Sequence, residues 1–205
     1  MLPGPPLRKE CPHCHRVKEL LSLLSGNTIG AKQWSDTKTV YRMLPRNSDI
    51  QKCPSCGKYF FLSDAKTLPS TDESEKGFTM DTGHLSYQEL REAFMQLYES
   101  ATEDQKYVLH LNILYAYNDR YRQDGSAEVE FGEEYDFFVQ NCQMLLKMNR
   151  VIPTLCAELY REIGEFEQCV QYLDSIEPVT GYENEVREQI RKRALDGDRM
   201  VFQLG

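Results

Sequence analysis

The chain has 205 residues, of which 40% are hydrophobic and 27% charged, and its formal net charge is −8. This ordinary mixture excludes a disordered or fibrous protein, and the length allows one large domain or two small ones. No apolar run approaches the roughly 18 residues of a membrane span. Prolines interrupt the first ten residues, so we expect no signal peptide there and a cytoplasmic protein.

The charge is unevenly distributed along the chain. Residues 1–60 contain ten Lys and Arg against four Asp and Glu, which gives +6, and residues 61–205 contain fourteen against twenty-eight, which gives −14. A basic end can indicate nucleic-acid binding. It can equally be attracted to the acidic part of the same chain, or offset the negative charge of metal-bound thiolates.

Two C-x-x-C pairs lie in the first part of the chain, CPHC at residues 11–14 and CPSC at residues 53–56. A C-x-x-C turn places two sulfurs on one side of a tight loop, where each can reach a metal at about 2.3 Å. Two such turns supply four thiolates, the ligand set of a closed structural zinc site. Iron is the main competitor for the same sulfurs. The predicted ligands of one zinc ion are Cys11, Cys14, Cys53 and Cys56.

The two pairs differ in the residue that follows them. Gly57 follows the second pair and supplies the positive φ that lets the next amides point back at the sulfurs. His15 stands at the same place after the first pair, which predicts a strained turn with a polar residue at its tip; the alternative is that His15 substitutes as a metal ligand. The long stretch between the pairs predicts a helix over 17–24 and a strand near 39–43, and a further strand is predicted near 58–62, after the second pair.

Trp34 is the only tryptophan of the chain, and it lies in a polar stretch between the two pairs. Large aromatic side chains are usually mostly buried. We therefore expect Trp34 to pack over the small core of the metal-binding module. The alternative is a recognition residue on the surface of that module.

Residues 65–84 are rich in polar residues and predict a linker. Helical periodicity follows from Leu85 onward. Ser86 with Glu89 predicts a capping box at the start of the first helix, and Thr102 with Gln105 predicts another at the second. The expected later helices cover residues 103–121, 133–149, 152–163, 166–177 and 182–195.

The predicted fold class is therefore mainly α, with a small α+β zinc-ribbon-like module. The module covers residues 1–64, the linker 65–84, and an α-helical domain of antiparallel hairpins 85–205. The seven cysteines are an odd number, which fits poorly with a secreted disulfide framework. The three outside the pairs are expected to be small core hydrophobes: Cys142, Cys156 and Cys169.

Part of the predicted helical domain resembles a tetratricopeptide repeat (TPR). The residues at that motif's spacing are Tyr160, Gly164, Phe166, Cys169, Leu173 and Ile176. Glycine allows the tight turn between two helices, and small residues allow the helices to approach closely. Pro153 stands where the motif has a tryptophan, and no clean copy lies 34 residues upstream, so an ordinary helical hairpin is the alternative.

Taken together, the chain resembles uncharacterised bacterial proteins that join an N-terminal zinc ribbon, with two C-P-x-C knuckles, to a TPR-like helical tail. The stretches 23–28, 34–36 and 43–45 contribute to this resemblance. It implies an architecture and a metal, and it implies no activity.

The sequence contains no phosphate-cradling glycine loop, nucleophile elbow or catalytic zinc motif. Four thiolates leave no open coordination position for a substrate, and we therefore expect no enzyme. The leading hypothesis is a zinc-binding interaction or scaffold protein with a protein or peptide partner. The alternatives are a nucleic-acid-binding zinc ribbon and, from another class, an electron-transfer protein with iron in the sulfur cage.

Overall fold

The computed structural model describes residues 1–69, 79–122 and 128–205, so residues 70–78 of the predicted linker lie outside the described residues. The chain forms two compact units. The first contains Met1–Ala31 and Val40–Leu109, and the second contains Lys32–Thr39 and His110–Gly205. Among the described residues, no helix is long and apolar enough to cross a membrane.

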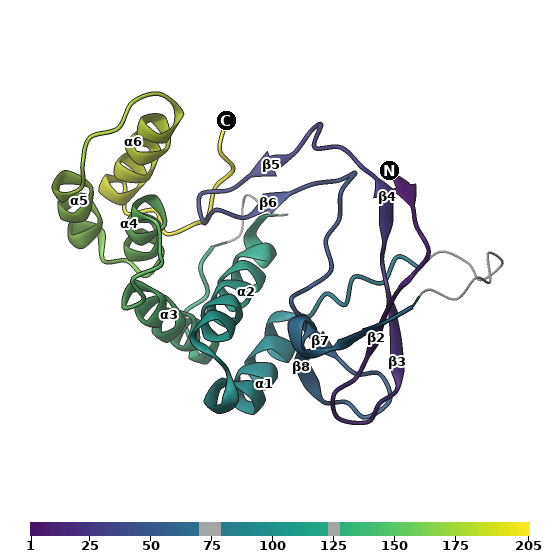
Figure 1. The fold of residues 1–205 in the computed structure, drawn as a ribbon. Coiled ribbons are helices and arrows are strands. Elements are labelled where there is room, and N and C mark those ends of the chain that lie inside the picture. The colour runs from purple at the N-terminus through teal and green to yellow at the C-terminus, as the bar shows by residue number, and fades with distance from the viewer. Residues whose placement is uncertain (70–78, 123–127) are drawn as a thin grey trace. The chain divides into compact units, whose positions relative to one another are not determined.

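The first unit is built on short antiparallel strands (Figure 1). Strand β1 pairs with β4, β2 pairs with both β3 and β9, and β7 pairs with β8. The bounds are Leu2–Pro3 for β1, Leu7–Glu10 for β2, Val17–Leu20 for β3, Leu23–Ser25 for β4, Ile50–Lys52 for β7, Tyr59–Phe61 for β8 and Lys66–Leu68 for β9. A short 3-10 helix, Leu62–Asp64, connects β8 to β9.

The predicted helix over residues 17–24 is wrong, because this segment forms β3 and β4. Strand β3 lies in register with β2, with Val17 opposite Glu10 and Leu20 opposite Leu7. Along β3 an exposed and a more buried residue alternate, which is the period of a strand. The predicted strands near 39–43 and 58–62 are observed as β6 (Thr39–Val40) and β8.

Helix α1 (Tyr87–Leu97) packs on β8 within the first unit. The predicted capping box is confirmed: the Ser86 side chain accepts from the Glu89 N–H, and the Glu89 carboxylate accepts from the Ser86 N–H. Tyr59 of β8 donates its hydroxyl to Glu92 (2.7 Å), and Gln96 donates its amide to the Tyr59 carbonyl (3.3 Å). These contacts connect α1 to the strand that follows the second cysteine pair.

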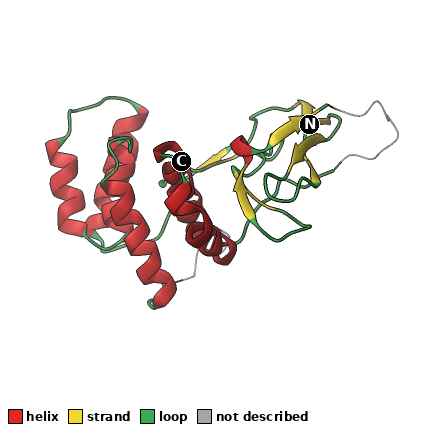
Figure 2. Cartoon of the chain, turned by 60° about the horizontal axis from the view of Figure 1, so that its bottom comes forward, coloured by secondary structure: helices red, strands yellow, loops and turns green. Residues whose placement is uncertain are grey.

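The second unit is helical (Figure 2). Helix α2 (Glu103–Arg122) begins in the first unit and continues into the second, and the second predicted capping box is present at its start. The other helices are α3 (Glu133–Leu146), α4 (Pro153–Glu162), α5 (Phe166–Ser175) and α6 (Tyr182–Leu195). All of the predicted helices from residue 86 onward are thus present, at bounds close to those expected.

Helices α4, α5 and α6 pack against one another and share one hydrophobic core. Cys169 of α5, one of the residues at the TPR spacing, is fully buried there, and so is the small residue Ala157 of α4. Gly164 adopts a φ of 84° in the turn between α4 and α5, a conformation that glycine takes without strain. Helices α4 and α5 therefore form a helical hairpin at the residues that resemble a TPR.

Residues 32–39 belong to the second unit because they pair with the C-terminal tail. This segment begins with β5 (Lys32–Gln33). Trp34 forms an antiparallel bridge with Gln203, and the Leu204 N–H donates to the Gln33 carbonyl (2.9 Å). Trp34 is therefore not part of the metal-binding module, and both expectations that placed it there are wrong.

A buried ionic network holds the same segment to α2. Asp36 is fully buried and accepts from both terminal nitrogens of Arg122, whose side chain is almost fully buried as well. The Asn118 side-chain amide donates to Asp36 (3.0 Å) and to Glu162 of α4 (2.9 Å). Because these polar groups are paired and hydrogen-bonded, the free-energy cost of burying them inside the unit is offset.

The compact units differ from the predicted division of the chain. Helix α1 lies with the metal-binding strands, and residues 32–39 lie with the helices. The predicted domains 1–64 and 85–205 thus stay a prediction about which fragments fold independently.

Candidate metal centre

The two cysteine pairs lie in two hairpin loops of the same length and shape. One loop connects β2 to β3, where Glu10 pairs with Val17, and the other connects β7 to β8, where Lys52 pairs with Tyr59. In each loop the N–H of the first cysteine donates to the carbonyl five residues later, at 2.9 Å. The local sequences CPHCHR and CPSCGK therefore fold into two equivalent knuckles.

The residue after each pair takes the left-handed conformation. Gly57 has a φ of 71° and His15 a φ of 60°, and the N–H of each donates to the carbonyl of the first cysteine in its loop. The predicted strain at His15 is confirmed, since non-glycine residues rarely adopt this conformation. The His15 side chain is 75% exposed and contacts Glu10 at 2.9 Å, so it lies outside the sulfur cluster.

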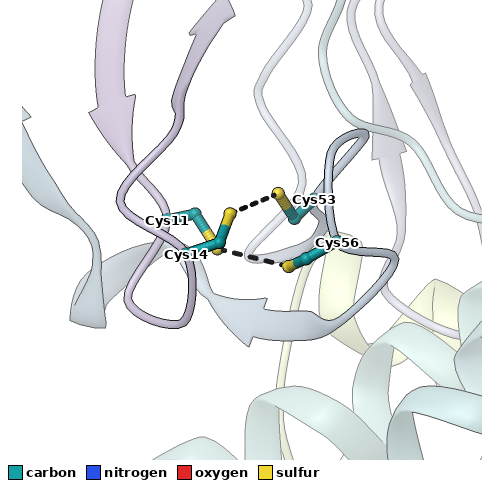
Figure 3. Close-up of side chains that lie close together, drawn as sticks. All are labelled: Cys11, Cys14, Cys53 and Cys56. Atoms are coloured by element: carbon teal, nitrogen blue, oxygen red, sulfur yellow. Dashed lines mark hydrogen bonds between the residues drawn. The ribbon is translucent and has the colours of Figure 1, made fainter.

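The four sulfurs face one another across the two knuckles (Figure 3). The Sγ atoms of Cys11 and Cys56 are 3.9 Å apart, and those of Cys14 and Cys53 are 3.6 Å apart. All four sulfurs lie within 4.8 Å of one another. A tetrahedron with metal–sulfur bonds of about 2.3 Å has edges of about 3.8 Å, so the cluster already has the size of a tetrathiolate site.

The cluster is packed on one side and open on the other. Cys11 and Cys53, the first cysteine of each pair, are buried, whereas Cys56 is exposed. Phe60 of β8 and Ala65 complete the small core around the sulfurs. Within the described residues, no other group of three or more Cys, His, Asp or Glu places its ligand atoms this close together.

The thiols differ in how readily they ionise. The pKa of Cys14 is raised to about 12: an amide hydrogen bond from Arg16 lowers it, but burial and the neighbouring thiols raise it by more. Burial raises the pKa of Cys53, but amide hydrogen bonds from Cys56 and Ser55 and the neighbouring thiols lower it by more, to about 7. A bound cation stabilises the ionised form of every thiol, so that all four sulfurs can be thiolates despite their different pKa values.

The first knuckle is tied to the second hairpin by His13. Its N–H points at the sulfur of Cys11, 3.4 Å away, and its ring Nε2 lies 3.0 Å from the carbonyl oxygen of Tyr59. Tyr59 also contacts α1, so one residue orients both the knuckle and the helix. Such outer contacts fix the direction of the ligands around a metal.

The lysines near the knuckles, which belong to the basic end of the chain, make other contacts. Lys9 donates to Thr67 (2.8 Å), Lys18 donates to the Gln51 side chain (2.8 Å), and Lys52 pairs with Glu89 (3.1 Å). Arg16 and Lys58, the last residue of each knuckle, are exposed at matching positions.

The three cysteines outside the pairs are buried, as expected for core residues: Cys142, Cys156 and Cys169. The sequence did not predict the buried network around Asp36. Its partners lie more than eighty residues away along the chain, and no local pattern marks a polar residue that pairs over such a distance.

Comparisons of the chain with protein-family models, curated proteins and solved structures found no match. The case for a metal centre therefore rests on the geometry of the four cysteines. That geometry is consistent with a zinc-ribbon-like site.

Proposed function

We propose that the protein is a cytosolic interaction or scaffold protein, in which one zinc ion has a structural role and the helices offer a surface to a protein or peptide partner. The observation that carries the proposal is the cluster of four sulfurs at tetrahedral spacing on two equivalent hairpins. Four protein thiolates fill a tetrahedral coordination sphere, and no position is left for a substrate. The metal thus cross-links two hairpins, and we propose no catalytic activity for it.

The helical hairpin of α4 and α5 supports the second half of the proposal. It has the glycine turn and the small buried residues of the TPR motif, and α6 covers it on one side. Repeat-type helix pairs commonly present extended surfaces to peptides and proteins. The resemblance to one such repeat therefore favours a binding role for the second unit.

The metal content of the purified protein tests the first half. We expect one zinc per chain, and we expect replacement of Cys11 and Cys53 by serine to abolish its retention. Iron as the major metal, with visible colour, would instead support electron transfer, because a tetrathiolate site accepts either metal. Less than about half an equivalent of any metal in protein kept reduced would contradict the site itself.

Nucleic-acid binding is the second candidate, because Arg16 and Lys58 are exposed at matching positions of the two knuckles. Oligonucleotide titrations at two salt concentrations separate it from the scaffold proposal. A binder that neutralises several phosphates releases counterions, so its affinity falls steeply with salt. We expect weak binding, since the chain is acidic overall. Submicromolar affinity that is lost in an Arg16→Ala, Lys58→Ala variant would overturn the scaffold proposal.

A further inference from the structure

The four sulfurs of the metal centre differ in how far solvent reaches them. Cys11 and Cys53 are buried, Cys14 is half-buried and Cys56 is exposed. Phe60 belongs to the small core around the two buried cysteines. A small oxidant dissolved in water therefore reaches Cys56 before it reaches the other three sulfurs.

Backbone amides protect the two buried sulfurs further. The His13 N–H points at the sulfur of Cys11, 3.4 Å away, and the N–H groups of Ser55 and Cys56 donate to the sulfur of Cys53. A thiolate that accepts hydrogen bonds is a weaker nucleophile, because these bonds stabilise its negative charge. Burial and hydrogen bonding thus both lower the reactivity of Cys11 and Cys53 toward an oxidant.

Two close contacts between sulfurs cross from one knuckle to the other. Cys56 lies 3.9 Å from Cys11, and Cys14 lies 3.6 Å from Cys53, as the dashed lines in Figure 3 show. An oxidised sulfur at Cys56 therefore has a sulfur of the opposite knuckle in contact with it. A disulfide formed at this contact joins the two hairpins.

The cysteines outside the metal centre do not compete for an oxidised sulfur. Cys142, Cys156 and Cys169 are buried inside the second unit. Buried thiols in apolar surroundings are inert. The products of oxidation are therefore confined to the four clustered cysteines.

We propose that Cys56 is an oxidation site for hydroperoxides, and that its oxidation replaces the metal cross-link between the two hairpins by disulfides between the same hairpins. This proposal rests on the zinc site of the proposed function, and it adds a reversible modification to that site.

The reaction balances with hydrogen peroxide as the oxidant. The Cys56 thiolate attacks one peroxide oxygen, the O–O bond breaks, and Cys56 becomes a sulfenic acid while hydroxide leaves. The Cys11 thiolate then attacks the Cys56 sulfur, forms the S–S bond and expels a second hydroxide. Two protons from solvent convert both hydroxides to water. The two cysteines lose two electrons, and these electrons reduce the peroxide.

The loss of two of its four ligands releases the zinc, because thiolates alone hold it. A second peroxide then oxidises Cys14 and Cys53 in the same way. The whole reaction consumes two peroxides and four protons for each zinc thiolate site, and it yields two disulfides, one zinc ion and four waters. The oxidised hairpins stay joined by covalent bonds, whereas the reduced metal-free hairpins have no cross-link.

Tryptic peptides report which knuckles are joined. Trypsin cleaves after Lys and Arg, so it releases one peptide of residues 10–16 with the first cysteine pair and another of residues 53–58 with the second pair. A disulfide between the knuckles links these two peptides, and a disulfide within a knuckle leaves them separate. Fragmentation of the linked peptides identifies the partner of each cysteine.

The experiment treats the full-length, zinc-loaded protein with increasing amounts of hydrogen peroxide. Zinc release is followed with a colorimetric indicator, and free thiols are alkylated before digestion. We expect about two equivalents of peroxide to release all of the zinc and to link the two peptides. Three of the seven cysteines should remain free for alkylation. A dithiol reductant together with added zinc should restore the starting protein.

The order of the reaction identifies the first sulfur to be oxidised. With less than one equivalent of peroxide in the presence of dimedone, which traps sulfenic acids, we expect the label on Cys56. Without dimedone, we expect the link between Cys11 and Cys56 before any other link. The control is Cys156→Ser in α4 of the second unit, which should leave zinc release and the pairing of the disulfides unchanged.

The contrary outcomes separate this proposal from the proposed function. Less than about half an equivalent of zinc before oxidation would contradict the metal site itself. If zinc is present, three results would overturn the oxidation site and leave the zinc site standing. These results are disulfides within each knuckle, a dimedone label on a cysteine other than Cys56, and zinc that is retained in excess peroxide.

Discussion

His15 and Gly57 occupy the same position in two loops that are otherwise built alike. A left-handed conformation costs a non-glycine residue about 1–2 kcal/mol, and only the first knuckle carries this cost. His15 offsets part of it through its contact with Glu10. The two knuckles thus hold their sulfurs in the same way with different local stability.

Exchanging the residue types at these positions should change stability in opposite directions. We expect His15→Gly to raise the free energy of unfolding of the zinc-loaded protein by up to about 1 kcal/mol, and Gly57→Ala to lower it by about 1 kcal/mol or more. A Cβ at Gly57 would meet no atom within 4 Å, so the loss would come from the backbone alone. Urea unfolding of each variant with zinc bound measures both changes in the free energy of unfolding. A destabilised His15→Gly variant would mean that the Glu10 contact outweighs the strain.

On α4, a buried carboxyl group connects the helix to the ionic network of the second unit. Burial raises the pKa of Glu162 well above its usual 4.5, and the negative charges of Glu158 and Asp36 raise it further. The group therefore binds a proton more tightly in the folded state than in the unfolded state. Its contribution to stability is fully present below pH 4.5 and is lost as the pH rises through the raised pKa.

The Glu162→Gln variant tests this pH-dependent contribution of Glu162 to stability directly. Glutamine resembles the protonated carboxyl group and can still accept from Asn118. We expect the melting temperature of the variant to exceed that of the wild type by an amount that grows as the pH rises above 4.5. Comparing the two proteins at each pH cancels the titration of all other groups. A constant difference, or one that grows toward acid, would mean that Glu162 is ionised in the folded state.

The helices and strands show which parts of the fold could be predicted from the sequence. Helices were predicted because capping boxes and apolar stripes are local, and Ser86 with Glu89 lies within one turn. Strands β3 and β4 were missed because their stability comes from pairing with β1 and β2, not from their own residues. Trp34 was misplaced and the buried pairing of Asp36 was not predicted for the same reason, since their partners lie far away in the sequence.

For the whole molecule, the metal site was the most predictable feature and the division of the chain the least. Four cysteines at two fixed spacings specify a tetrathiolate site by chemistry alone. The composition of residues 25–38 predicts a polar stretch but gives no sign that residues 32–39 complete a distant helical unit. The consequence is that the only tryptophan and the metal-binding cysteines belong to different units.

This separation predicts a two-step loss of structure. Each unit has a hydrophobic core of its own, and the four clustered cysteines belong only to the hairpins of the first. Because a structural zinc contributes folding free energy to the elements that it connects, a chelator should unfold the metal-binding hairpins first. We expect the Trp34 emission and most of the helical circular dichroism to persist when the zinc leaves, and then to melt together at higher temperature.

A Cys11→Ser, Cys53→Ser variant should behave like the chelated protein, and a Cys156→Ser variant serves as the control, because Cys156 lies in α4 of the second unit. Metal release is followed with a colorimetric indicator in the same titration. If the Trp34 emission shifts in step with zinc release, the two units unfold cooperatively, and the metal then stabilises the helical surface as well as the hairpins. If the emission stays constant, binding to the second unit can be studied in the metal-free protein.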